Sequence, residues 1–340
     1  MNNLTNTKFS IFFSIVIIFL SISSLSFTNL SINPQPEKTL SSPQKRLTNE
    51  TLGTSTHIDF ELVSENTGWF VEENKLFITI NSGIDWVDIT PTYIEEFTIE
   101  SVYFLDGLSG WVLTSFNSGL GNSFDLFSTQ DGGNTWEHTT ISDASGQIIY
   151  ETFDSTYMQW INVKKGWVLI RESTSINFSE GDFYITTDGG YSWEKVGSPI
   201  GDNFLFLDEE IGYIAGGPDG SVIQRTDNGG LTWANIANQF SPWGDNLILS
   251  LPVLMEDGIQ VIAALKSKIN APDEVLLFNS MDNGSSWMLL DQYLFPESHD
   301  GSSSIQISSG PLDHILIILE EYSTIINYTP AGFSLLTTIN

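Results

Sequence analysis

Cysteine is absent from this 340-residue chain, and basic residues are scarce, with 12 lysines and arginines against 42 aspartates and glutamates. Without cysteine the fold cannot depend on disulfides, and a thiolate nucleophile or a cysteine-ligated zinc site is excluded. Histidine is also rare. The four histidines lack the spacing of metal ligands, so a zinc site is not expected; they are His57, His138, His299 and His314.

The shortage of basic residues leaves a formal net charge of −30. Nucleic-acid binding depends on lysine and arginine meeting phosphate, so a nucleic-acid partner is not expected. Binding to an anionic membrane surface is disfavoured for the same reason. The charge predicts a solvated acidic surface, or attraction for a cation or a basic partner. Acidic groups could supply oxygen ligands for calcium, although no calcium-loop motif accompanies Glu72-Glu73, Glu95-Glu96 and Asp208-Glu209-Glu210.

Long hydrophobic runs are missing apart from one near the N-terminus, at residues 9–20. That run is shorter than the roughly 20 residues of a membrane-spanning helix. It follows Lys8, and Ser24-Leu25-Ser26 fits a small-x-small cleavage site. We therefore predict a signal peptide over residues 1–26. The alternative is an uncleaved anchor, in which residues 9–25 would form a membrane tether. Either way the protein is expected to be exported, as a secreted or cell-surface protein.

Residues 27–56 are rich in Ser, Thr, Asn and Pro and show no periodicity. This composition predicts a flexible tether. Beyond it, apolar residues make up 41% of the whole chain, which is enough for a sizeable core. We predict one large domain over residues 57–340.

That domain carries a short pattern, [ST]-x-[DN]-x-G-x-[ST]-W, in four clean copies. A worn copy precedes them at residues 79–86, with Asn81 and Trp86 in the matching places. The clean copies occupy residues 129–136, 186–193, 226–233 and 280–287.

The spacing within the pattern predicts a tight hairpin turn. A short Asp or Asn side chain can accept hydrogen bonds from the backbone just downstream of it. Glycine three residues before the tryptophan can take a positive φ without a steric penalty. The Ser or Thr and the Trp then resume a strand, in which the Trp offers a large apolar face for packing.

A second recurring feature is a glycine followed by an aromatic residue and a β-rich run. Its aromatic residues are Trp69, Trp111, Trp167 and Tyr213. The turn pattern matches the Asp-box, or BNR repeat. Together, the two features resemble the BNR-like β-propellers of the photosystem II assembly and stability factor family. The resemblance covers roughly residues 57 to 290, and the remainder more loosely.

The resemblance implies an all-β fold, a single β-propeller of four-stranded antiparallel blades. The tryptophans of the pattern recur at intervals of about 40 to 57 residues, in the range of propeller repeats. We expect about six blades, with seven as the alternative. In the fifth unit the first strand is expected to run over Leu247–Leu254.

The Asp-boxes are expected to be structural, because each Asp or Asn is used by its own turn. No catalytic, metal or cofactor site is assigned to them. The structural box residues are Asp131, Gly133, Trp136, Asp188, Gly190, Trp193, Asn228, Gly230, Trp233, Asp282, Gly284 and Trp287.

Enzymes with Asp-boxes include the sialidases, which this chain resembles in the boxes only. That family holds its substrate carboxylate with three arginines. Here Arg46, Arg171 and Arg225 are the only arginines, and Arg46 lies in the tether while Arg225 adjoins a box. Three converging guanidiniums cannot be assembled from these positions, and lysine lacks the bidentate fork. Sialidase activity is therefore not expected.

We expect a non-catalytic scaffold that binds a protein or a glycan. The alternative is a glycoside hydrolase, which needs only two carboxylates across a cleft. Long loops between strands are the expected contact regions. These loops are Ser115–Ser123, Ile141–Ser155 and Lys268–Glu274. The photosystem-assembly relatives bind their partner through a basic patch, which this acidic chain lacks, so only the scaffold role carries over.

Overall fold

The structure is a computed structural model of the chain. It describes residues 59–338 with gaps at 93–96, 120, 144–145, 148, 173–180, 198, 218, 256, 267–271, 296–304, 311–313 and 320–323. The predicted signal peptide or anchor and the predicted tether lie outside the described residues and stay predictions. Within the described part, no helix is long and apolar enough to cross a membrane.

Six antiparallel sheets of at least four strands follow one another along the chain. In the first, third, fourth and sixth sheets the strands pair in sequence order from the innermost strand outward, and the second and fifth sheets each carry one additional short strand. The first three sheets and a small two-stranded sheet contain β1 Asp59–Leu62, β2 Gly68–Glu72, β3 Lys75–Thr79, β4 Val87–Asp88, β5 Thr98–Phe104, β6 Gly110–Asn117, β7 Asn122–Thr129, β8 Glu137–Thr140, β9 Ser142–Asp143, β10 Gly146–Gln147, β11 Ile149–Tyr150, β12 Phe153–Trp160, β13 Gly166–Glu172, β14 Gly181–Thr186 and β15 Glu194–Gly197.

The last three sheets are built in the same way, with two short 3₁₀ helices between the fourth and the fifth. Their elements are β16 Asn203–Phe206, β17 Gly212–Gly216, β18 Val222–Thr226, β19 Ala234–Asn235, η2 Ala237–Gln239, η3 Ser241–Trp243, β20 Ile248–Leu249, β21 Val253–Leu254, β22 Gln260–Lys266, β23 Glu274–Ser280, β24 Met288–Leu294, β25 Gln306–Gly310, β26 His314–Leu319, β27 Thr324–Thr329 and β28 Gly332–Thr338.

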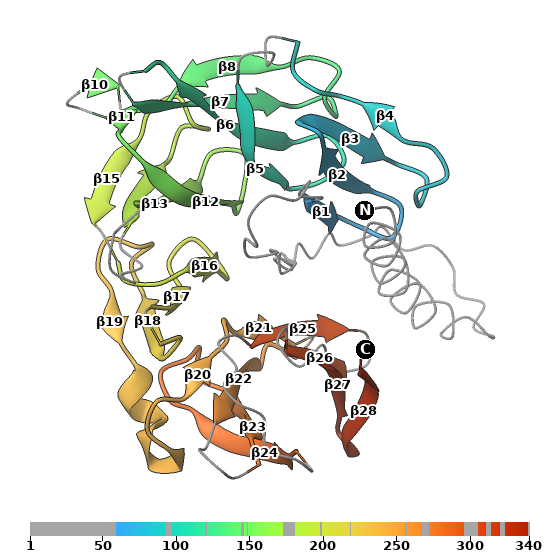
Figure 1. The fold of residues 1–340 in the computed structure, drawn as a ribbon, viewed down its shortest axis with the longest axis vertical. Helices are drawn as coiled ribbons and strands as arrows, with labels where there is room; N and C mark the ends of the chain where they lie inside the picture. Colours follow the sequence, from blue (N-terminus) through green and yellow to red (C-terminus); the bar gives the residue numbers. More distant parts are fainter. Residues whose placement is uncertain are drawn as a thin grey trace.

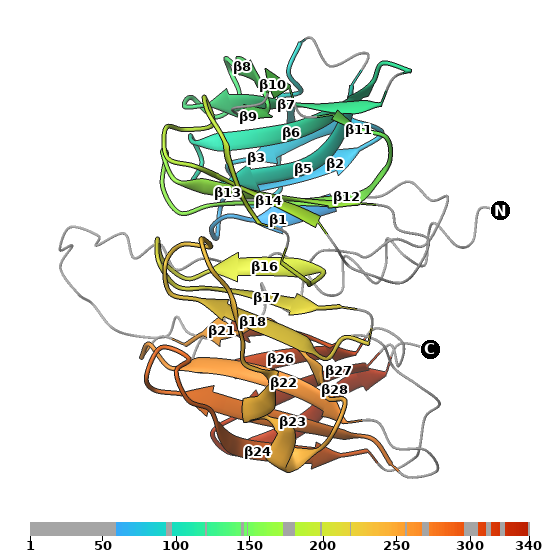
Figure 2. The same cartoon turned by 90° about the vertical axis from the view of Figure 1, so that its left-hand side faces the viewer.

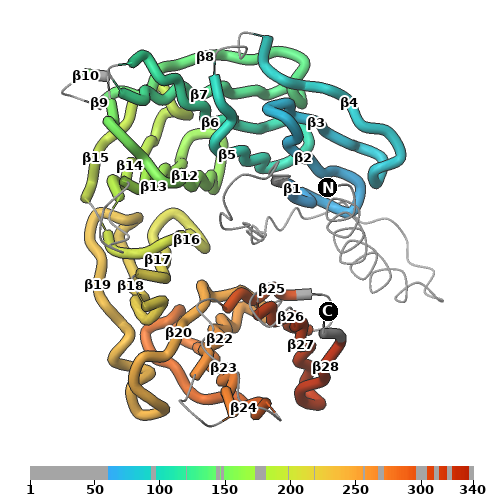
Figure 3. The backbone as a smooth tube through the Cα atoms, viewed as in Figure 1, coloured from blue at the N-terminus to red at the C-terminus, as the bar shows by residue number. Residues whose placement is uncertain are grey.

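The sheets are arranged around an arc, from β1–β4 at one end to β25–β28 at the other (Figure 1). Seen from the side, β16 to β18 lie between β12–β14 and β21–β22 (Figure 2). Strands β5, β16 and β25 border the middle of the arc, whereas β4, β19 and β24 lie at its outer rim (Figure 3). The all-β prediction is confirmed, and the choice between six and seven blades stays a prediction.

Middle strands are apolar on both faces because a neighbouring sheet covers each face. Strand β6 is buried from Gly110 to Ser115, and β22 from Gln260 to Leu265. The outermost strand β8, with sequence Glu-His-Thr-Thr, has no buried residue. The middle strands are therefore mostly apolar, whereas the outermost strand β8 is polar.

Five apolar clusters join consecutive sheets around the arc. The cluster between the second and third sheets contains a stack of Trp111 on Trp160, with ring centroids 4.1 Å apart and planes 7° from parallel. Trp167 stacks on Phe206 in the same way between the third and fourth sheets, at 3.7 Å. Such aromatic pairs add about 0.5–1.5 kcal/mol beyond their buried area. No cluster of described residues joins the first sheet to the sixth.

Glycine begins β2, β6, β13 and β17, and the structure shows why. A Cβ on Gly166 would overlap the ring of Trp160, and one on Gly212 would overlap the ring of Phe206. These are the rings on which the aromatic residues of the preceding sheet stack. Because glycine has no Cβ, it leaves space for the ring on which the aromatic residue of the preceding sheet stacks.

Two expectations about strands were wrong. The innermost strand of the fifth sheet does not run over Leu247–Leu254 but divides into β20 and β21. Pro252 lies between them and has no N–H to donate to β22. Just before it, the hydroxyl of Ser250 accepts the N–H of Ala263 on β22 at 3.0 Å. The region Ile141–Ser155, expected to be a loop, contains β9, β10 and β11, and β11 adds a fifth strand to the second sheet.

Candidate recognition face

Each Asp-box of the structure is a hydrogen-bonded turn. In the box at residues 186–193, the carboxylate of Asp188 accepts the hydroxyl of Thr186 at 2.8 Å and the N–H of Ser192 at 3.0 Å. Gly190 has φ +97° and donates its N–H to the hydroxyl of Thr186 at 3.0 Å. The carboxylate is thus occupied by the turn that contains it.

The other boxes repeat this arrangement. The hydroxyl and then the backbone N–H of Ser286 lower the pKa of Asp282 to about 2. Asn228 keeps the same acceptor role toward the N–H of Thr232 at 3.0 Å, and its own amide donates to the Thr232 hydroxyl. In the worn copy, Asn81 accepts the N–H of Asp85 at 2.9 Å.

The boxes contact the sheet that precedes them. A Cβ on Gly190 would overlap Leu126 of the second sheet, and one on Gly230 would overlap Phe183 of the third. The box tryptophans lie in, or pack against, the clusters that join their own sheet to the preceding one: Trp136, Trp193, Trp233 and Trp287. The same clusters contain all four aromatic residues of the glycine–aromatic strands, namely Trp69, Trp111, Trp167 and Tyr213.

The strand order places the boxes and the predicted contact loops at opposite ends of the strands. Boxes connect the third and fourth strands of a sheet, whereas the second and third strands, β6 and β7, join at the opposite end, after Asn117 and before Asn122. The expected loop Ser115–Ser123 was too long, because its ends belong to these two strands. The connection before β12 and the one between β22 and β23 emerge on that same side, although 267–271 lie outside the described residues. We call this side, away from the boxes, the loop face.

Four of the described basic side chains lie toward the loop face, and each forms an ion pair there. Arg171 at the end of β13 pairs with Asp202 at 3.1 Å and with Asp154 at 3.8 Å. Lys195 on β15 pairs with Asp182 at 2.5 Å. Their positive charges are therefore already matched.

The remaining two cations also have carboxylate partners. Lys266 at the end of β22 lies 3.7 Å from Glu274 and also donates to the backbone carbonyl of Trp243. Lys75 at the start of β3 lies 3.8 Å from Asp88. The other described basic residues, two lysines and Arg225, lie near the box side.

Carboxylates outnumber these cations at the loop face. Six are exposed and belong to the turns or strand ends on that side: Glu72, Glu73, Glu151, Glu172, Asp219 and Asp245. A seventh carboxyl, on Glu100, is largely enclosed, and burial raises its pKa although the hydroxyl of Ser115 donates to it at 2.6 Å. The loop face therefore presents negative charge.

A buried polar cluster joins the second sheet to the third near the loop face. The hydroxyl of Tyr150 on β11 donates to Asp182 at 2.7 Å and lies 2.7 Å from the hydroxyl of Tyr184. Burial, reinforced by these two partners, raises the pKa of Tyr150 well above its usual value. The sequence gives no local signal for this cluster, because Tyr150 lies 32 residues from Asp182 and 34 from Tyr184.

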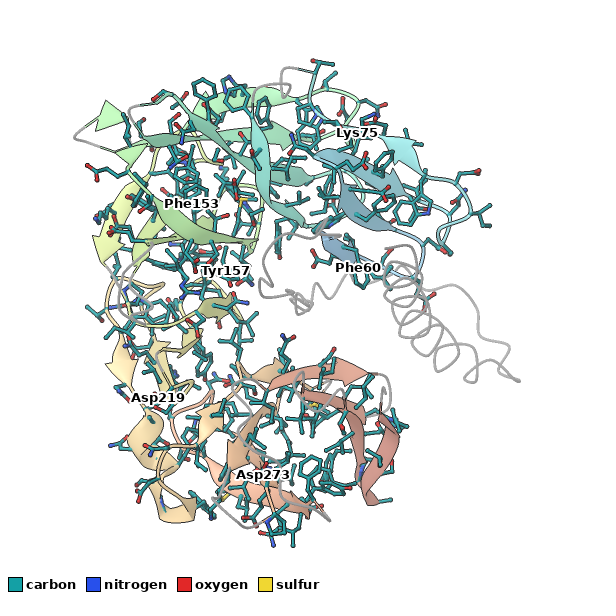
Figure 4. The ribbon with its side chains drawn as sticks, viewed as in Figure 1. Phe60, Lys75, Phe153, Tyr157, Asp219 and Asp273 are labelled. Atoms are coloured by element: carbon teal, nitrogen blue, oxygen red, sulfur yellow. The ribbon has the colours of Figure 1, made fainter. Side chains whose placement is uncertain are left out.

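Two aromatic side chains of the innermost strands lie beside the middle of the arc (Figure 4). Figure 4 shows Phe60 on β1 and Tyr157 on β12 beside that region. In the part of the chain that the structure describes, no three His, Asp or Glu side chains are grouped closely enough to hold a metal ion. Of the acidic groups considered for calcium, Glu95-Glu96 lies outside the described residues. Asp208 accepts the N–H groups of Glu210 and Ile211 in a turn.

Comparison with known proteins bears on the fold. No family model matches the chain, and no curated protein matches it. A solved structure of YCF48 bound to D1 peptide is 14% identical, covering 91% of this chain and 88% of that one, with a TM-score of 0.52. The fold is a β-propeller.

Two enzymes are more distant. A streptogramin B lyase structure is 13% identical over 81% of both chains, with a TM-score of 0.46. The NanB sialidase of Streptococcus pneumoniae is 13% identical over 86% of this chain and 50% of its own, with a TM-score of 0.35. Similarity at this level does not extend to the activity of the propeller described here.

Proposed function

We propose that this protein is a non-catalytic, exported propeller whose loop face binds a basic segment of a partner protein. The observation that carries the proposal is the charge of that face. All four described cations there are paired with carboxylates, and six more carboxylates are exposed. A partner with lysine or arginine would meet complementary charge, which gives orientation and a fast association rate.

The comparison with a peptide-bound propeller supports a polypeptide rather than a glycan as the ligand. The YCF48 propeller was solved with a bound D1 peptide. A neutral glycan would gain nothing from the excess of carboxylates, whereas a cationic peptide would. Exposed ion pairs contribute little individually, about 0.2–1 kcal/mol each, so several must act together.

The test compares two variants of the full-length protein with equal charge changes. The loop-face variant carries E72Q, E73Q, E172Q and D219N. The control variant carries four matched changes on exposed carboxylates of the box side: E65Q, E209Q, E210Q and D227N. The probe is a fluorescein-labelled ten-residue peptide that alternates lysine with serine, and its glutamate counterpart serves as the negative ligand.

We expect the wild type to bind the lysine peptide and not the glutamate peptide. The loop-face variant should bind roughly tenfold more weakly, from several lost pairs of modest strength, while the control variant binds as wild type. Equal weakening in both variants would refute a dedicated loop face. Release of sugar from a polysaccharide panel by the wild type would instead support the glycoside hydrolase alternative.

A further inference from the structure

The outermost strands of the six sheets differ in length. In the first four sheets they are short: β4 and β19 have two residues each, and β8 and β15 have four. In the last two sheets, β24 and β28 have seven residues each. A long outer strand presents a long row of backbone N–H and C=O groups to a further strand.

The outer strands differ in composition as well. Strand β8 begins with Glu137 and His138, and β15 begins with Glu194 and Lys195. These four residues are exposed. Short length and charge are the usual means by which proteins prevent edge-to-edge pairing. The first four sheets are thus protected against strand addition.

Strand β24 is longer and more apolar. It keeps two protective features, a one-residue register shift against β23 at Leu290 and the charge of Asp291, whose carboxylate accepts the N–H of Gln292 at 2.8 Å. Its sequence is Met-Leu-Leu-Asp-Gln-Tyr-Leu, and three of its apolar side chains are exposed: Met288 by 56%, Leu290 by 40% and Leu294 by 59%. Strand β28 exposes two, Leu335 and Leu336. In the sheet order, β24 is last, with no described strand on its outer side, and Figure 1 shows it at the rim.

A second copy of this chain fits the edge poorly. Symmetric antiparallel pairing that overlaps all seven residues centres on Asp291, the midpoint of Met288–Leu294. It would set Asp291 opposite its own copy, and like charges directly opposite in a strand pair are destabilising. Each copy would also bring a formal net charge of −30. The complementary occupant is a chain with a basic residue opposite Asp291.

We propose that the outer edge of β24 binds an extended segment of a partner polypeptide as an added strand. The segment alternates apolar residues, which cover the exposed side chains of β24, with lysine or arginine near Asp291. Backbone hydrogen bonds supply affinity in this mode, and the alternate side chains supply selectivity. This surface lies at the rim, apart from the loop face, and does not depend on the function proposed above.

The experiment uses the full-length protein and a fluorescein-labelled nine-residue peptide that alternates valine with lysine and threonine. A second peptide of the same sequence is N-methylated at alternate residues, which removes the hydrogen-bond donors along one edge. The edge variant carries L290K and L294K. The matched control carries I80K and I84K, which replace apolar side chains that are 71% and 80% exposed on the worn box.

We expect the wild type and the control to bind the unmethylated peptide alike, and the edge variant to bind it at least about tenfold more weakly. N-methylation should abolish binding to the wild type. Circular dichroism of the edge variant checks that it is folded. If it is not, the single exposed change Leu294→Lys replaces it.

Three results would overturn the proposal. The wild type could fail to bind the unmethylated peptide, or it could bind the methylated peptide equally well. It could also sediment as a dimer that the edge variant converts to a monomer, which would identify a second copy as the occupant. Weakened binding in the loop-face variant alone, with the edge variant unaffected, would assign the peptide to the loop face and likewise refute the edge site.

Discussion

The box tryptophans allow a paired test of how the sheets are held together. Trp193 is 5% exposed, lies in the cluster between the second and third sheets, and meets Trp160 edge-on at 6.0 Å. Trp86 occupies the same place in the worn box but is 40% exposed, with one edge-on contact to Phe70 at 4.7 Å. The same residue type in the same motif position is therefore buried in one copy and exposed in another.

Trp193→Ala should lower the free energy of unfolding by about 3–5 kcal/mol, the usual loss for a core aromatic truncation. Trp86→Ala should lower it by only about 0.5–1.5 kcal/mol, the value of one aromatic pair. Urea unfolding of both variants and the wild type, followed by far-ultraviolet circular dichroism, measures the difference without relying on tryptophan fluorescence.

The comparison requires that both variants have the same dependence of unfolding free energy on urea as the wild type. If the slope of unfolding free energy against urea is unchanged, the shift in midpoint reports stability directly. Equal losses in the two variants would refute the assignment of the box tryptophans to the interfaces between sheets. A loss below about 1.5 kcal/mol for Trp193→Ala would refute it as well.

Three further predictions concern the boxes and the buried polar cluster. Replacing the box aspartates with asparagine, as at Asn228, should keep the turns but flatten the pH dependence of stability. Their lowered pKa values contribute stability that is present above pH 3.8 and lost as the pH falls below it, which acid titration of unfolding measures; these residues are Asp131, Asp188 and Asp282. Gly284→Ala should be more destabilising than Gly258→Ala by about 1–3 kcal/mol in thermal unfolding, because both have positive φ but only the first would overlap Tyr213. Tyr150→Phe should cost about 1–3 kcal/mol at neutral pH. The raised pKa of Tyr150 contributes stability below pH 10 that is lost as the pH rises above it, so this variant should lose less stability in alkaline urea titrations.

Local turns were predictable from sequence because their hydrogen bonds close within a few residues. Asp188 and Ser192 are four positions apart, so the bond between them is implied by the motif itself. The start of β13 at Gly166 could be anticipated from the glycine–aromatic pattern for a similar reason. The stack of Trp167 on Phe206 could not, because the partner is set by how the sheets pack.

The candidate recognition face was predictable only in part. Three loops were expected from sequence, and strand order places those regions on one side of the sheets. Only the connections are as expected, because Ile141–Ser155 contains three strands and Ser115–Ser123 overlaps the ends of β6 and β7. The pairing of Arg171 with Asp202 has no local signal, so the composition alone did not show that this cation is already matched. The division of Leu247–Leu254 into two strands does have a local signal, Pro252, which interrupts the hydrogen bonding of an otherwise apolar run.

The five clusters between consecutive sheets also have a consequence for local unfolding. Each sheet is stabilised by its immediate neighbours, so the described part of the chain behaves as a row in which inner units have two supports and terminal units have one. Amide hydrogens in β2 and β26 should then exchange with solvent sooner than those in β13 and β17. Local unfolding would begin at either end of the row and advance sheet by sheet. The first and the sixth sheets should therefore be the first to be cut by proteases.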